Sequence, residues 1–255
     1  MTYCLGILLQ DGLVMASDSR SNAGVDDITK VKKMAIFAKK GHRVIAVLSA
    51  GNLATTQAVV TALRQELDDG DPNRDLMAAK TMFHAARIVG DMLREIIRRE
   101  RDFVMPYGDP GGSFLVGGQI NGEPHRLFQI YTAGNFVEAS ARSQMLQIGE
   151  TKYGKPVLDR TLSNTVSLDE AAKLALLSFD ATIRSNLSVE GPIDLLRYRK
   201  ESLAVDNLCK FSRHDPYWEE LRAGYGDGLL SLIRNLPNPP CSSEANPPTP
   251  LRSAG

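Results

Sequence analysis

The order of the predicted elements indicates an α+β fold, with helices layered outside antiparallel sheets. Short β-rich runs come in adjacent pairs near the start of the chain, two helical segments follow, and strands and helices then return. Neighbouring strands joined by tight turns pair antiparallel, whereas a parallel sheet needs a crossover helix between successive strands. The chain shows no such regular alternation and no internal repeat, so antiparallel sheets are expected.

The first fifty residues contain four apolar runs, at 2–9, 12–17, 34–38 and 43–50. The gaps within the two pairs are short and carry glycine and charged residues, which favour tight turns. Two hairpins are therefore expected.

Two consecutive helices are expected over 52–67 and 76–101, because apolar residues recur there at the three- and four-residue spacing of a helix face. A third hairpin is expected over 113–131. Its turn is Asn121-Gly122, a dipeptide that tolerates positive φ at both central positions.

The later part of the chain predicts two further helices and a strand. Ser167 and Glu170 have the spacing of a capping box, which satisfies the free N–H groups at the start of a helix running to about Arg184. Residues 193–198 read as a strand, and 218–233 as an amphipathic helix.

Residues 1–235 are expected to form one domain. The remaining segment, 236–255, is rich in proline and polar residues and holds too little apolar surface to pack. A disordered tail is expected there.

The composition excludes several classes of function. The 255 residues are 43% hydrophobic and 24% charged with a formal net charge of +0, which is typical of a globular protein. Balanced charge offers no basic face for a nucleic acid, and no stretch approaches the ~20 apolar residues of a membrane helix. No nucleic-acid or membrane partner is expected.

The cysteine and histidine positions indicate neither a disulfide framework nor a metal site. The three cysteines, Cys4, Cys209 and Cys241, show no Cys-x-x-Cys spacing, and the four histidines lie far apart. A glycine-lysine pattern at 149–155 lacks the hydroxyl residue of a phosphate-binding loop, because Pro156 stands in its place. We expect a reducing cytoplasm, no cofactor and no metal.

Residues able to carry chemistry gather instead near the start of the chain. Thr2 follows the initiator methionine, Asp18 lies in Ala-Ser-Asp-Ser-Arg, Lys33 ends Val-Lys-Lys, and Gly51 lies in Ser-Ala-Gly-Asn. This order and spacing closely resemble the N-terminal half of proteasome-type β subunits. With Lys-Pro-Val-Leu-Asp and Arg-Ser-Asn-Leu-Ser further on, the resemblance covers roughly residues 2–200, and it is strongest to the bacterial ancestral β subunits, the Anbu branch.

The resemblance implies a four-layer αββα sandwich of the N-terminal nucleophile hydrolase class. It also implies a cytoplasmic homo-oligomer, arranged as a ring or a shallow spiral. The substrate would be a peptide or an unfolded protein. An unidentified ATP-dependent partner that delivers substrate to the assembly is compatible with the resemblance.

The resemblance also implies catalytic roles. Thr2, once Met1 is removed, would be the nucleophile with its own α-amine as the base. Lys33 would lie beside it, Asp18 would keep Lys33 charged, and the backbone N–H of Gly51 would bind the oxyanion. Ser188 would be the late active-site serine of the family. Removal of the initiator methionine is expected because the threonine side chain is small.

By the same resemblance, the substrate pocket beside Thr2 is lined by five uncharged residues: Ser21, Val31, Ala35, Ser49 and Leu53. We therefore expect cleavage after apolar residues such as leucine.

The chain departs from the family pattern at two places. Ser185 stands where the family has an aspartate, and the region of Gly149 and Glu150 replaces the family's glycine-serine loop. The leading hypothesis is a threonine peptidase. Two alternatives stay open: an amidase acting on a small amide or isopeptide, and a weakly active proteasome-like scaffold.

Overall fold

The computed structural model describes residues 2–22, 28–67, 71–163 and 165–240. Its strands are β1 (Tyr3–Leu9), β2 (Gly12–Ser17), β3 (Arg20–Asn22), β4 (Ile28–Lys30), β5 (Met34–Lys39), β6 (Arg43–Gly51), β7 (Gly112–Ile120), β8 (Arg126–Ile130), β9 (Phe136–Glu138), β10 (Met145–Gly149), β11 (Ile193–Arg199) and β12 (Leu208–Phe211). Its helices are α1 (Leu53–Gln65), α2 (Met82–Val104), α3 (Lys155–Thr161), α4 (Leu168–Ser185) and α5 (Pro216–Asn235).

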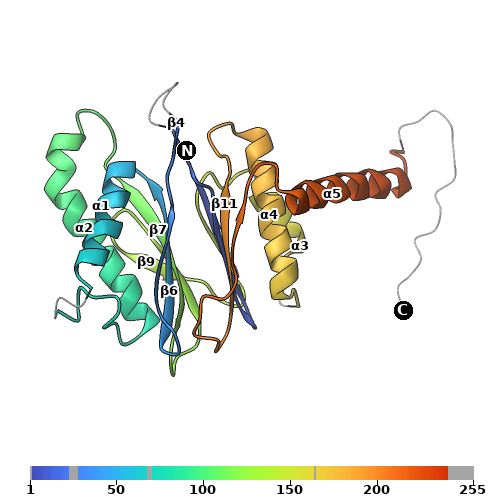
Figure 1. Cartoon of the computed structure of the whole chain (residues 1–255). Helices are drawn as coiled ribbons and strands as arrows, with labels where there is room; N and C mark the ends of the chain where they lie inside the picture. Colours follow the sequence, from blue (N-terminus) through green and yellow to red (C-terminus); the bar gives the residue numbers. More distant parts are fainter. Residues whose placement is uncertain (1, 23–27, 68–70, 164, 241–255) are drawn as a thin grey trace.

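Two five-stranded antiparallel sheets form the middle of the molecule, in the orders β10-β1-β2-β11-β12 and β5-β6-β7-β8-β9. Helices α1 and α2 cover the outer face of the second sheet, and α3 and α4 cover the outer face of the first (Figure 1). The predicted four-layer αββα sandwich is confirmed. A two-stranded sheet, β3-β4, lies outside these layers.

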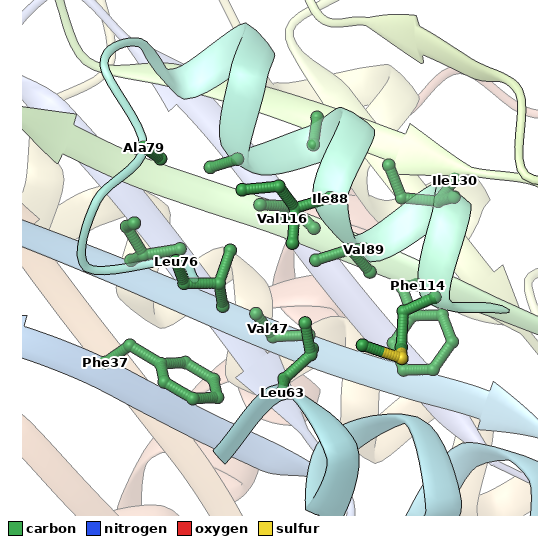
Figure 2. Packing of buried hydrophobic residues seen from close by; sticks show 14 of the residues in the cluster. Phe37, Val47, Leu63, Leu76, Ala79, Ile88, Val89, Phe114, Val116 and Ile130 are labelled. Carbon is green, nitrogen blue, oxygen red and sulfur yellow. The ribbon is translucent and has the colours of Figure 1, made fainter. Parts of the chain in front are cut away.

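The side-chain period of a strand explains why the two sheets stack. In β6, Ile45 and Val47 belong to the apolar cluster beneath α1 and α2, whereas Ala46 and Leu48 belong to the cluster between the sheets. Both faces of β6 are therefore buried, which accounts for its nearly continuous apolar sequence. Figure 2 shows the helix side of this packing, with Val47 beside Leu63 of α1.

The three predicted hairpins are present. The β1–β2 pairing ends with Leu9 opposite Gly12, and the β5–β6 pairing ends with Lys39 opposite Arg43. Strand β8 pairs antiparallel with β7 after the Asn121-Gly122 turn.

The predicted capping box is also confirmed. The Glu170 N–H donates to Ser167 Oγ at 3.2 Å, and the Ser167 N–H donates to the Glu170 carboxylate at 2.8 Å. Helix α4 therefore begins where the sequence places it.

The structure corrects the start of the second helix. Residues 76–81 are not helical, because Thr81 has an extended backbone and its hydroxyl accepts the His84 N–H at 3.0 Å as an N-cap. Six short elements were not predicted from the sequence: β3, β4, β9, β10, β12 and α3. Four of them, β3, β4, β9 and β12, have only three or four residues, which is too short to show a clear period.

Helix α5 projects away from the body of the molecule (Figure 1), and Trp218 in its first turn is its one buried residue. Most of the predicted tail, at 241–255, lies outside the described residues. None of the described helices is both long enough and apolar enough to span a membrane.

Candidate active site

Thr2 immediately precedes β1 and is held by backbone contacts on its C-terminal side. Its carbonyl oxygen accepts the Glu150 N–H at 2.7 Å. The next residue, Tyr3, donates its N–H to Asp18 Oδ1 at 3.0 Å. The half-buried Thr2 is therefore fixed between the edge strand β10 and the end of β2.

Asp18 and Lys33 form a buried ion pair next to this residue. Lys33 Nζ donates to the two carboxylate oxygens at 2.9 and 2.8 Å, and it also donates to the Arg20 carbonyl. The exposed fractions are 0% for Asp18 and 5% for Lys33. Burial raises the pKa of the Asp18 carboxyl, and the Lys33 ammonium opposes that shift. Each charge compensates the other, so losing one would leave an unpaired buried charge.

Gly51 ends β6 with a backbone conformation that favours glycine. Its φ is 117°, and an added Cβ would lie 2.6 Å from the Gly111 carbonyl oxygen. Glycine is therefore required by the backbone itself. The oxyanion role of its N–H stays a prediction.

A cavity of about 500 Å³ opens beside Thr2, between β5, β6 and α1. Its lining includes Thr2 together with two of the predicted catalytic residues, Lys33 and Gly51. Four of the five predicted pocket residues also line it: Val31, Ala35, Ser49 and Leu53. Ser21 lies in β3, and its side chain is outside the part of the structure that is described.

The cavity also contains residues that the sequence analysis did not assign to it. One face of α1 supplies Thr56, Gln57, Val60, Thr61 and Arg64, and the strand side adds Lys32, Met34 and Ala50. The helical spacing could have predicted these α1 residues, because they lie on the same helix face as Leu53, which was assigned to the pocket. Lys32 is exposed and borders the cavity.

Ser188 is not among the cavity-lining residues. Its N–H donates to Asn186 Oδ1 at 2.9 Å, and Asn186 Nδ2 donates to Glu150 Oε2 at 3.0 Å. The buried Glu150 in turn holds the Thr2 carbonyl through its backbone N–H. Ser188 is thus linked to Thr2 through this chain of contacts, while Ser185 is an exposed residue at the end of α4.

Cys4 lies two residues after Thr2 but is fully buried between the sheets. Its thiol lies 3.5 Å from the Ser49 carbonyl oxygen, and burial raises the pKa of the thiol above its ordinary value. A buried neutral thiol is a poor nucleophile.

The two stacked antiparallel sheets between layers of helices, with Thr2 directly before β1, match the fold of the N-terminal nucleophile hydrolase class. A family model described as "Proteasome subunit" matches residues 2–196. The chain belongs to the proteasome subunit family.

Solved structures of Anbu proteins share this fold. Anbu from Yersinia bercovieri superposes with a TM-score of 0.87 at 43% identity, covering 92% of this chain and 98% of that one. The structure titled "Helical Assembly of the Anbu Complex from Pseudomonas aeruginosa" gives a TM-score of 0.89 at 41% identity, covering 95% of this chain and 100% of that one. Proteasome subunit beta 1 of Thermococcus sibiricus is 30% identical over 73% of this chain and 81% of its own length.

Proposed function

We propose that the chain is a threonine-type peptidase subunit that acts within a homo-oligomeric assembly. The observation that carries the proposal is the joint lining of one cavity by Thr2, Lys33 and Gly51, with Asp18 buried behind Lys33. An isolated threonine hydroxyl reacts poorly at neutral pH, so the reaction needs a base within reach of it. Removal of Met1 supplies that base by freeing the Thr2 α-amine.

The proposed reaction proceeds through an ester. The Thr2 hydroxyl oxygen attacks the peptide carbonyl carbon while the α-amine takes the hydroxyl proton. The Gly51 N–H stabilises the oxyanion, and the Lys33 ammonium favours the neutral form of the nearby amine. The leaving amine takes the proton as the C–N bond breaks, and water then hydrolyses the ester and restores Thr2.

The test combines intact mass with a threonine-directed epoxyketone. The wild-type chain should lack Met1 and gain one adduct, mapped to Thr2. Thr2→Ala should form no adduct and lose peptide hydrolysis by on the order of a thousandfold or more, because it lacks the nucleophile. Lys33→Ala should come close to this loss, and Thr2→Ser should keep some turnover.

Cys4→Ala is the matched control, since Cys4 lies in the same strand but is buried away from the cavity. It should keep most of the activity. A purified chain that retains Met1, or a Thr2→Ala variant that hydrolyses peptides at the wild-type rate, would contradict the proposal.

A weakly active scaffold is a second candidate, favoured by the position of Ser188 outside the cavity lining. In that case the assembly would be intact, but the chain would retain Met1 or the epoxyketone would leave Thr2 unmodified. The amidase alternative would instead show the adduct with turnover of small amides and none of peptides.

A further inference from the structure

The charged residues in the described lining of the cavity beside Thr2 are all cationic. Three cations line it, Lys32, Lys33 and Arg64, and the described lining contains no Asp or Glu. Lys33 is neutralised by Asp18 at 2.8 Å. Lys32 and Arg64 make no ion pair with any described residue. Two positive charges without an ion-pair partner among the described residues therefore border the space in which a substrate would lie.

The geometry of α1 brings Arg64 toward the nucleophile. Leu53 and Arg64 lie on the cavity face of the helix, about 16 Å apart along its axis at a rise of about 1.5 Å per residue. Side chains of a helix tilt toward its N-terminus, and the N-terminus of α1 is the end near Gly51. The long Arg64 side chain can therefore cover part of the distance back toward Thr2.

The rest of the lining suits a side chain with an apolar stem. Ala35 and Leu53 lie near the Thr2 end, and Val60 lies one helical turn before Arg64. A side chain entering past Thr2 would meet aliphatic groups first and then the exposed Arg64 near the C-terminal end of α1. Arginine binds carboxylates through paired hydrogen bonds, and a cleft lined by one sign of charge concentrates the opposite sign.

We infer that this cavity selects substrates with an acidic side chain, glutamate before aspartate, on the residue whose carbonyl Thr2 attacks. The inference rests on the proposed function where it concerns cleavage. The preference in binding does not depend on that function. It differs from the apolar preference expected from the sequence, which took into account only the uncharged residues near Thr2. Arg64 is the specificity-determining residue, and Lys32 adds to the positive field.

Binding is measured with the Thr2→Ala chain, which keeps the cavity but cannot turn substrate over. Fluorescent peptides that differ at one position, Glu, Gln, Leu or Lys, are titrated and followed by anisotropy. The Glu peptide should bind about tenfold more tightly than the Gln peptide, the size of one charge-assisted hydrogen bond. Raising the salt concentration should reduce this ratio, since the groove is open to solvent.

Variants then assign the preference. Arg64→Gln should bring the Glu-to-Gln ratio close to one, Arg64→Lys should keep part of it, and Lys32→Gln should lower it less. Arg99→Gln is the matched control, because Arg99 is an exposed arginine on α2 outside the cavity. It should leave the ratio unchanged.

The outcomes separate this inference from the proposed function. Equal binding of the Glu and Gln peptides, or tighter binding of the Leu peptide, overturns the inference even if the wild-type chain forms the Thr2 adduct. An absent adduct overturns the peptidase proposal, while a Glu preference that depends on Arg64 still establishes the acidic-ligand site.

Discussion

Tyr3 and Cys4, the two residues after Thr2, fix the start of β1 from opposite faces of its sheet. Tyr3 packs in the cluster beneath α3 and α4, and Cys4 packs in the cluster between the sheets. The Tyr3 hydroxyl lies 2.7 Å from Ser178 Oγ and accepts Gln147 Nε2 at 2.6 Å. Polar contacts on one side and close packing on the other therefore hold the strand that presents Thr2.

Because of Tyr3, the stability of the fold should fall at alkaline pH. Burial raises the pKa of Tyr3 to about 12, whereas a tyrosine hydroxyl in the unfolded chain has a pKa of about 10. The native state thus binds this proton more tightly, and stability present below pH 10 is lost as the pH rises toward 12. At pH 11 the loss is on the order of 1 kcal/mol. Urea unfolding at pH 9 and pH 11 measures it.

Tyr3→Phe should reduce the difference in unfolding free energy between the two pH values by that amount, whatever its effect at pH 9. Tyr107→Phe is the control, because the Tyr107 side chain is 92% exposed. An unchanged pH difference in Tyr3→Phe would contradict the assignment.

Helix α1 serves the core on one face and the cavity on the other. Val59 and Leu63 are buried in the cluster beneath α1 and α2, while Val60 and Arg64 line the cavity. Asn52 caps the helix by accepting the Thr55 N–H at 3.2 Å. The helix is therefore fixed directly after Gly51, so its register decides which side chains meet the substrate.

Two glycines in different helices should respond oppositely to alanine. An added Cβ at Gly90 in α2 would lie 2.2 Å from the Gly134 carbonyl oxygen, whereas at Gly226 in α5 it would meet no atom within 4 Å. Gly90→Ala should destabilise the fold by about 2 kcal/mol through overpacking. Gly226→Ala should stabilise α5 by about 0.5–1 kcal/mol through helix propensity.

Urea unfolding followed by circular dichroism compares the two variants with the wild type. Each variant is the other's control, since the substitution is identical and both sites are helical. Effects of the same sign at both positions would contradict the close approach of α2 to the turn at Gly134.

The single subunit leaves several large apolar side chains exposed to solvent. Along α5, Leu230 is 54% exposed and Ile233 is 61% exposed, and the helix extends away from the body (Figure 1). An isolated helix gains little stability without packing, and exposed apolar groups of this kind mark contacts with other chains.

We expect the purified chain to form large homo-oligomers. Closed rings and open spirals both arise from one repeated contact between identical subunits. The mass of the assembly should therefore be many times that of a single chain. Light scattering at micromolar concentration measures it. A sample that contains only monomers would contradict the expectation.

Much of the architecture follows from local sequence patterns. The apolar runs predicted the six strands of the three hairpins, and the Ser167–Glu170 spacing predicted the start of α4. The order of motifs predicted the family that the comparison then showed. The start of α2 could not be predicted, because the apolar period continues before Met82 and the Thr81 cap decides where the helix begins.

The sequence by itself determined the fold class, the buried faces of the long strands and helices, and the placing of Thr2, Asp18 and Lys33 in one family pattern. The tertiary structure alone decided what surrounds Thr2. It brought Arg64 into the cavity and linked Ser188 to Glu150 through Asn186. The physical reason is that periodicity reports which face of an element is apolar, whereas convergence of distant segments depends on sheet order and helix register.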